Sequence, residues 1–127
     1  MMKKAEINMV ATNSIEALGL YKRIFELENV IKTSQKVGYN EVFFSIYGLR
    51  FHIMDENAQF NLISPAKGGV LSCWFDITVE SIKETFEKAM ENGCEVIFPV
   101  TFVDTHNVYN GMFKDKFGYV WLIHQEI

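Results

Sequence analysis

Apolar and polar residues alternate along several short stretches of this chain. Near its start, Ile7, Met9 and Ala11 lie on one side of such an alternation, with Glu6 and Asn8 on the other. Side chains of a β-strand point alternately to its two faces, so this period of two predicts a strand over residues 5–11. The same reasoning, with turn residues as boundaries, predicts seven further strands, over residues 30–37, 41–46, 49–54, 70–78, 95–99, 108–114 and 119–125.

Two other segments carry apolar residues at helical spacing, and each opens with a capping box. Asn13 stands three residues before Glu16, and Ser81 stands three residues before Glu84. In this arrangement the first side chain accepts a hydrogen bond from a free N–H of the first helical turn. The pattern predicts two helices, one over residues 14–27 and one that follows Ser81 and ends at Asn92-Gly93.

The predicted elements occur in the same order in each half of the chain: a strand, a helix and three strands. The two capped helices begin about 67 positions apart in a chain of 127 residues, which indicates an internal duplication. A half of about 60 residues with one helix buries little surface alone, so we expect both halves to pack as one domain. The expected organisation is α+β over residues 1–127, with a first module at about 5–56, a linker at about 57–69 and a second module at about 70–127.

Four stretches of the sequence are similar to motifs of one known family. ALGLYKRIF at residues 17–25 is similar to the family's "ALEFYKxxF" helix, and DKFGYVW at residues 115–121 to its "DPFGxxW" turn, with Lys116 in place of proline. Residues 79–93 are similar to its second helix, and residues 49–56 to its "LMLSDE" hairpin. The chain thus resembles the glyoxalase/bleomycin-resistance/dioxygenase proteins, the vicinal oxygen chelate superfamily, and within it the PhnB-like branch. The resemblance implies two βαβββ modules whose curved mixed sheets surround a cavity, commonly in a homodimer.

The resemblance also implies a position for a divalent metal, with one ligand from each of four strands. Those positions correspond to Glu6, His52, Trp74 and Leu122 in this chain. Indole and leucine side chains offer a metal no lone pair, so we expect the usual metal site to be absent and no cofactor to be bound. His124, two residues beyond Leu122, leaves one alternative, a relocated metal site made of Glu6, His52 and His124.

The alternation along the predicted strands, considered without the family resemblance, also places polar side chains together on one face of the sheets. Such residues, with an aromatic side chain among them, suit a ligand cavity, although an antiparallel sheet can also turn a polar face to water. His52 is a candidate acid or base if a carboxylate such as that of Glu6 lies nearby, and a structural imidazole otherwise. The candidate ligand-binding residues beside this pair are Asn8, Arg50, Ser72, Trp74, Asp76 and His124.

The charge of the chain argues against one class of partner, since a net charge of −4 does not suit binding to nucleic acid. The chain is also 49% hydrophobic and 14% aromatic. No run of apolar residues is long enough to span a membrane, and no signal peptide is evident, so we expect a cytoplasmic protein. There, Cys73 and Cys94 are expected to be buried, reduced thiols. The apolar excess and the open sheet edges favour a homodimer.

Three functions remain open from the sequence. The first is a metal-free protein that binds a small organic ligand in the sheet cavity. The second is a metal-dependent lyase, isomerase or dioxygenase that uses the relocated ligand set. The third is a protein that sequesters a drug or metabolite, in which Trp74 would stack on a cationic ligand and Glu6 or Asp76 would pair with its charge. Whether the protein is an enzyme stays open.

Overall fold

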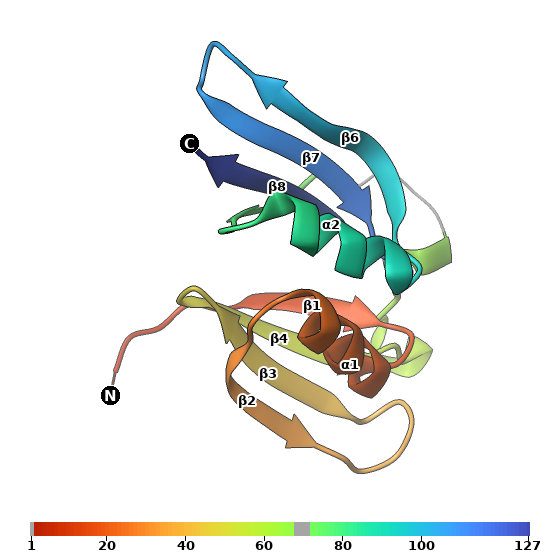
Figure 1. Ribbon diagram of the computed structural model, residues 1–127. Helices are drawn as coiled ribbons and strands as arrows, with labels where there is room; N and C mark the ends of the chain where they lie inside the picture. Colours follow the sequence, from red (N-terminus) through yellow and green to blue (C-terminus); the bar gives the residue numbers. More distant parts are fainter. Residues whose placement is uncertain (1, 68–71) are drawn as a thin grey trace. The chain divides into compact units, whose positions relative to one another are not determined.

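The computed structural model describes residues 2–67 and 72–127, which form two compact units, Met1–Ala66 and Lys67–Ile127. Each unit contains a strand, a helix and three strands, as the duplication predicts (Figure 1). The boundary falls in the expected linker, of which residues 68 and 69 lie outside the described residues, as do residues 70 and 71 of the predicted fifth strand. That the units pack as one domain stays a prediction. Neither helix in the described part of the chain has the length and apolar character needed to cross a bilayer.

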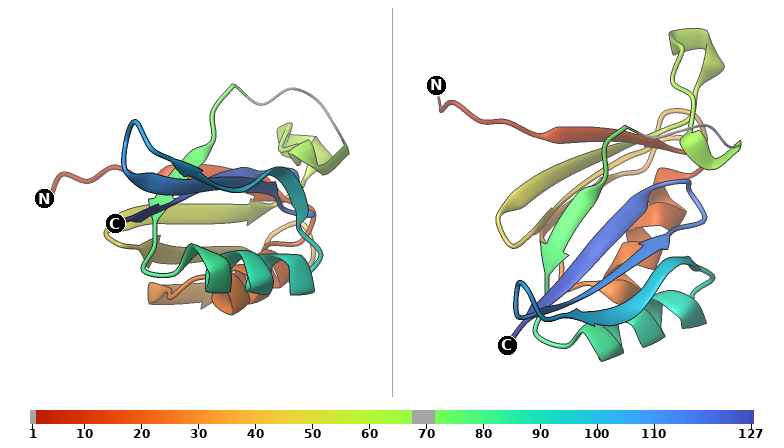
Figure 2. Two further views of the ribbon diagram at one scale, coloured as in Figure 1. Left: turned by 45° about the horizontal axis from the view of Figure 1, so that its top comes forward. Right: turned by 90° about the horizontal axis from the view of Figure 1, so that it is seen from above.

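The first unit is a four-stranded mixed sheet with one helix against it. Its elements are β1 (Ile7–Ala11), α1 (Ser14–Ile24), β2 (Glu28–Thr33), β3 (Glu41–Ile46) and β4 (Leu49–Asp55). In the sheet the strands follow the order β1-β4-β3-β2, and β1 runs parallel to β4 while the other neighbours are antiparallel (Figure 2).

The core of this unit lies between α1 and one face of the sheet. Phe44 and Phe51 stack with their ring centroids 5.2 Å apart, and Tyr21 of α1 lies 5.8 Å from Phe44. All three are fully buried, as are Val42 and Ile53 on the same face of the sheet. The alternation in the sequence therefore identifies the buried face, and the residues between these positions form the opposite, open face.

Helix α1 begins where its capping box predicts and ends earlier than expected. The Asn13 side chain accepts a hydrogen bond from the Glu16 N–H at 3.1 Å. The helix stops at Ile24 rather than at residue 27, because Phe25 is already extended and its N–H closes the last turn on the Tyr21 carbonyl. The following strand accordingly begins at Glu28, before the predicted residue 30, and ends at Thr33.

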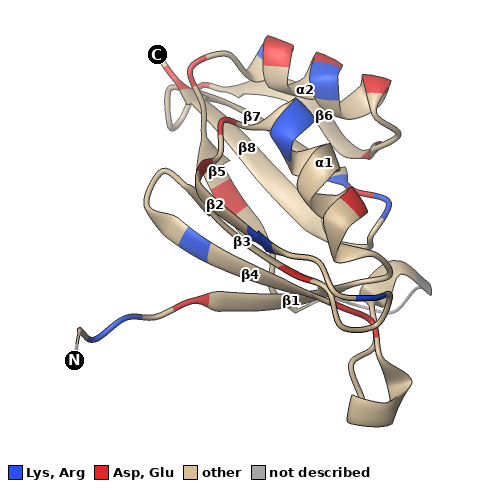
Figure 3. Ribbon diagram, turned by 90° about the horizontal axis from the view of Figure 1, so that it is seen from below, with Lys and Arg blue, Asp and Glu red and all other residues tan. Residues whose placement is uncertain are grey.

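The second unit repeats this plan. The elements are β5 (Phe75–Thr78), α2 (Ile82–Glu91), β6 (Glu95–Val103), β7 (Val108–Lys114) and β8 (Val120–Glu126). The strand order is β5-β8-β7-β6, with β5 parallel to β8. Apolar residues of α2 pack toward the sheet, and Figure 3 shows acidic and basic positions interspersed along the same helix.

Three expectations for this unit are wrong. Strand β5 begins at Phe75, so Ser72 and Trp74 precede it and do not share its alternation. Strand β6 continues past Pro99 to Val103, because it lies at a sheet edge, where a missing N–H is tolerated, and its pairing is irregular between Phe98 and Thr101. Cys73 is exposed since it lies in the segment before β5, whereas Cys94 is buried as expected.

Candidate functional site

The open face of the first sheet holds most of the polar side chains expected in that module. Strand pairing places Asn8 beside His52, and on the other side of β4 it places Phe43 beside His52 and Ser45 beside Arg50. Cross-strand neighbours on one face lie within side-chain contact distance. A continuous polar and aromatic surface therefore crosses strands β1, β4 and β3.

His52 is held on three sides. Its Nε2 lies 2.8 Å from Oε1 of Glu41, its Nδ1 lies 3.1 Å from Oδ1 of Asn8, and its ring stacks on Phe43 with centroids 4.1 Å apart and planes 3° from parallel. A carboxylate only accepts hydrogen bonds, so an Nε2–H donates to Glu41, while Nδ1 pairs with the Asn8 amide, which can present its oxygen or its NH2 group to the ring. The ring is fixed in orientation, and both of its nitrogen atoms are engaged.

The carboxylate beside His52 belongs to Glu41 rather than Glu6. The carboxylate of Glu6 instead forms an ion pair with Lys4 Nζ at 3.0 Å. The hydrogen bond from Lys4 lowers the pKa of Glu6, and the charges of Lys4, His52 and Arg50 act in the same direction. Sequence analysis missed Glu41. The hairpin turn at Tyr47-Gly48 could have predicted this contact, because the turn sets the register between β3 and β4. In that register Glu41 lies diagonally across from His52.

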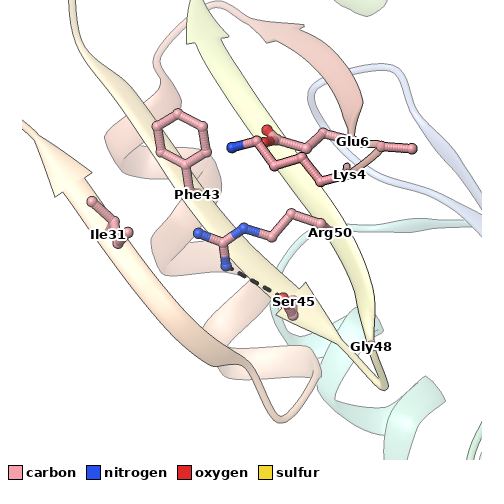
Figure 4. Close-up of a pocket in the computed structure, with 8 residues that line it drawn as sticks. Lys4, Glu6, Ile31, Phe43, Ser45, Gly48 and Arg50 are labelled. Carbon is pink, nitrogen blue, oxygen red and sulfur yellow. Dashed lines mark hydrogen bonds and ion pairs between the residues drawn. The ribbon is translucent and has the colours of Figure 1, made fainter. Parts of the chain in front are cut away.

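A hollow of about 470 Å³ lies on this open face (Figure 4). Arg50 is its central charged residue: Nη1 donates to the Asn29 carbonyl at 2.7 Å and to Ser45 Oγ at 3.3 Å, and the guanidinium lies over the Phe43 ring, 5.6 Å from its centroid. The hollow combines apolar, cationic and anionic groups in one small space. Its lining residues are Lys4, Ala5, Glu6, Ile31, Phe43, Ser45, Gly48 and Arg50.

The second unit holds a histidine with the same kinds of partner. Nε2 of His124 lies 2.8 Å from Oδ1 of Asp76, and its Nδ1 contacts Oδ1 of Asn110. In the first unit the amide partner, Asn8, comes from the first strand and the carboxylate partner, Glu41, from the third. In the second unit the carboxylate, Asp76, comes from the first strand and the amide, Asn110, from the third. Trp74 and Ser72, which were expected beside them, lie exposed ahead of β5.

The predicted site residues thus fall into two groups. The first unit brings together Glu6, Asn8, Arg50 and His52, and the second brings together Asp76 and His124. The relocated metal set draws on both units and stays a prediction.

The described side chains of either unit do not fit the family's metal. Within each unit, no three His, Cys, Asp or Glu side chains are grouped so that they could hold an ion. The donors that are present already have partners, since Glu6 pairs with Lys4 and both nitrogens of His52 are engaged. Trp74 and Leu122 supply no lone pair at the two other family positions.

Comparison with solved structures identifies the fold. The chain superposes on a point mutant of the fosfomycin resistance protein FosX of Listeria monocytogenes, in complex with Mn(II) and 1S,2S-dihydroxypropylphosphonic acid. The TM-score is 0.74 and the identity 17%, covering 100% of this chain and 94% of that one. A PhnB protein from Bacillus cereus, described as a putative 3-demethylubiquinone-9 3-methyltransferase, gives 0.66 and 19% identity over 97% and 99% of the two chains. TioX from Micromonospora sp. ML1 gives 0.68 and 12% identity over 98% and 100%.

These similarities confirm the fold that the resemblance predicts, namely duplicated βαβββ modules of the glyoxalase/bleomycin-resistance type. No protein-family model matches the chain, and no curated protein matches it either.

Proposed function

We propose that this protein, which has the glyoxalase/bleomycin-resistance fold, binds a small organic ligand in the hollow of its first sheet. The hollow carries the proposal. Its volume of about 470 Å³ suits a small molecule, and it combines apolar walls at Ile31 and Phe43 with charged groups at Arg50, Lys4 and Glu6. Support also comes from FosX, which has the same fold and was solved with a small phosphonic acid.

Nuclear magnetic resonance titration tests the binding proposal. Fosfomycin and 1S,2S-dihydroxypropylphosphonic acid are suitable first probes, followed by a fragment library. We expect saturable shifts in the amide signals of Ile31, Ser45 and Gly48, and loss of these shifts in a Phe43→Ala variant. Phe60→Ala, which removes an exposed aromatic side chain from the segment after β4, is the matched control and should leave binding unchanged. Probes that perturb other surfaces but not these amides would contradict the proposal.

We further propose that the ligand is bound without the metal that the family usually holds. The donor chemistry supports this, because the candidate ligands are engaged by protein partners or lack lone pairs. Elemental analysis, with calorimetric titration of nickel, zinc, manganese and iron, should give no stoichiometric binding. Tight binding of one ion per chain that is lost in His52→Ala would refute the metal-free proposal and support the relocated set of Glu6, His52 and His124.

The same geometry favours binding or sequestration over acid–base catalysis. Both ring nitrogens of His52 have protein partners, and its ring stacks on Phe43 rather than lining the hollow itself. A catalytic acid or base must reach the group whose proton it transfers. His52 therefore suits the role of a positioning residue that supports the Phe43 ring.

We also propose that the chain is a cytoplasmic homodimer. The support for a dimer is the apolar surface along the edge strand β6, where Val96, Phe98 and Phe102 are exposed. Light scattering should give about 29 kDa, twice the 14.7 kDa of one chain. A mass near that of one chain at micromolar concentration would refute the dimer.

A further inference from the structure

We infer that the hollow selects an organic anion, with its charged group on Arg50 and its apolar part against Ile31 and Phe43. This inference rests on the proposed function and adds the chemical class of the ligand. It reverses one expectation from the sequence, in which Glu6 or Asp76 would pair with a cationic ligand.

The first argument is the pairing of charges. Glu6 and Lys4 neutralise one another at 3.0 Å. In the second unit, Asp76 is engaged by His124 at 2.8 Å. Arg50, by contrast, forms no ion pair with a carboxylate of the described residues. The charge in the hollow that lacks a counter-ion is therefore positive.

The second argument is the geometry of the guanidinium. Both hydrogen bonds described for Arg50 use Nη1, and both acceptors, the Asn29 carbonyl and the Ser45 hydroxyl, are neutral oxygens. Nη2 and Nε keep N–H donors that can take two oxygens of a carboxylate, phosphonate or phosphate at once. Figure 4 shows the guanidinium between Phe43 and Ser45, and Lys4 and Glu6 line the same hollow.

The third argument is preorganisation. The Asn29 carbonyl, the Ser45 hydroxyl and the Phe43 ring hold the guanidinium in place without neutralising it. A fixed donor group loses less conformational entropy when a ligand binds than a free side chain does. The neighbouring Ile31 and Phe43 would cover an apolar ligand body, so the best ligand is a small amphipathic anion rather than an inorganic ion.

Four simple probes of similar size test this inference. Benzoate and phenylphosphonate carry the proposed charge, benzamide is a neutral counterpart, and benzylammonium is a cation. In amide titrations we expect the anions to bind about tenfold or more tightly than benzamide, benzylammonium to bind most weakly, and added salt to weaken the binding of the anions alone.

Variants separate charge from shape. Arg50→Gln should weaken benzoate binding about tenfold, and Arg50→Lys, which keeps the charge but loses the planar fork, should lie between it and the wild type. Glu6→Gln removes a negative charge from the hollow and should strengthen anion binding. Lys88→Gln, on the exposed face of α2, is the matched control and should change nothing. Amide spectra of each free variant establish that it is folded.

The outcomes distinguish this inference from the proposed function. If none of the four probes shifts the amides of Ile31, Ser45 and Gly48, the hollow is not a ligand site and the proposed function fails. If benzamide or benzylammonium binds there as tightly as benzoate, or a folded Arg50→Gln variant keeps the wild-type affinity for benzoate, the hollow binds ligands but the anion inference is overturned.

Discussion

The buried carboxylate of Asp55 should be a major source of stability in the first unit. It is 2% exposed at the end of β4, and it accepts backbone N–H groups from Ser14 at 2.7 Å, Gly38 at 2.9 Å and Asn40 at 3.3 Å. One side chain therefore joins the first turn of α1 to the loop that leads into β3. Asp55→Ala would remove all three hydrogen bonds at once.

The size of the effect follows from the surroundings of each donor. Ser14 is fully buried, so its N–H would lose a charge-assisted hydrogen bond without gaining water, at a cost of about 2 kcal/mol. The donors at Gly38 and Asn40 are partly buried, and water would replace much of each bond, so they add about 0.5 kcal/mol each. We expect Asp55→Ala to lower the free energy of unfolding by about 3 kcal/mol, a large fraction of the stability of a small domain.

Hydrogen exchange with mass spectrometry is the best assay, because it reports each unit separately. Peptides from α1, β3 and β4 should lose protection by the expected amount. Asp104→Ala, at an exposed position between β6 and β7, is the matched control and should stay within about 0.5 kcal/mol of the wild type. A loss below about 1 kcal/mol in a folded Asp55→Ala variant would refute the assignment of the carboxylate as a structural link.

The same group predicts a dependence on pH. Burial opposes the ionisation of Asp55, but the hydrogen bonds from Ser14, Gly38 and Asn40 outweigh it, so its pKa lies below the ordinary value of 3.8. The charged form is therefore favoured in the folded state, and its contribution is complete above the ordinary pKa and is lost as the pH falls through the lowered one. Urea denaturation should show a loss of stability below about pH 4 that is smaller in Asp55→Asn than in the wild type. Equal slopes in the two proteins would contradict this reasoning.

Three further predictions concern other parts of the chain. A Cβ added at Gly111 would lie 2.5 Å from the Phe86 ring, so Gly111→Ala should cost about 1–3 kcal/mol in urea denaturation, and Phe86→Leu in the same chain should recover part of it. Asn13→Ala removes the cap of α1 and should cost about 1 kcal/mol, whereas Asn13→Asp should cost little. Burial, with the charge of a nearby aspartate, raises the pKa of Cys94 to about 12, so a thiol reagent at mildly alkaline pH should label the exposed Cys73 alone, and Cys73→Ser should abolish rapid labelling.

The sequence by itself determined the local elements and the repeat. Alternation identified the strands of both units, with 41–46 and 108–114 matching β3 and β7 at both ends. The caps at Asn13 and Ser81 were predictable because a capping box acts within one helical turn, and the structure contains both hydrogen bonds. The motif resemblance added the fold, which the comparisons with solved structures confirm.

Other features were decided by the tertiary structure, because they depend on residues that are distant in the chain. Glu41 rather than Glu6 became the partner of His52 through the register between β3 and β4, while Lys4, two residues away, engaged Glu6. The three donors to Asp55 come from segments up to 41 residues away. Arg50 was a candidate from its place on the strand, but the absence of an ion pair with any described carboxylate required the positions of all its neighbours. Periodicity predicts which face a side chain occupies, and the packing of distant segments decides which groups it meets there.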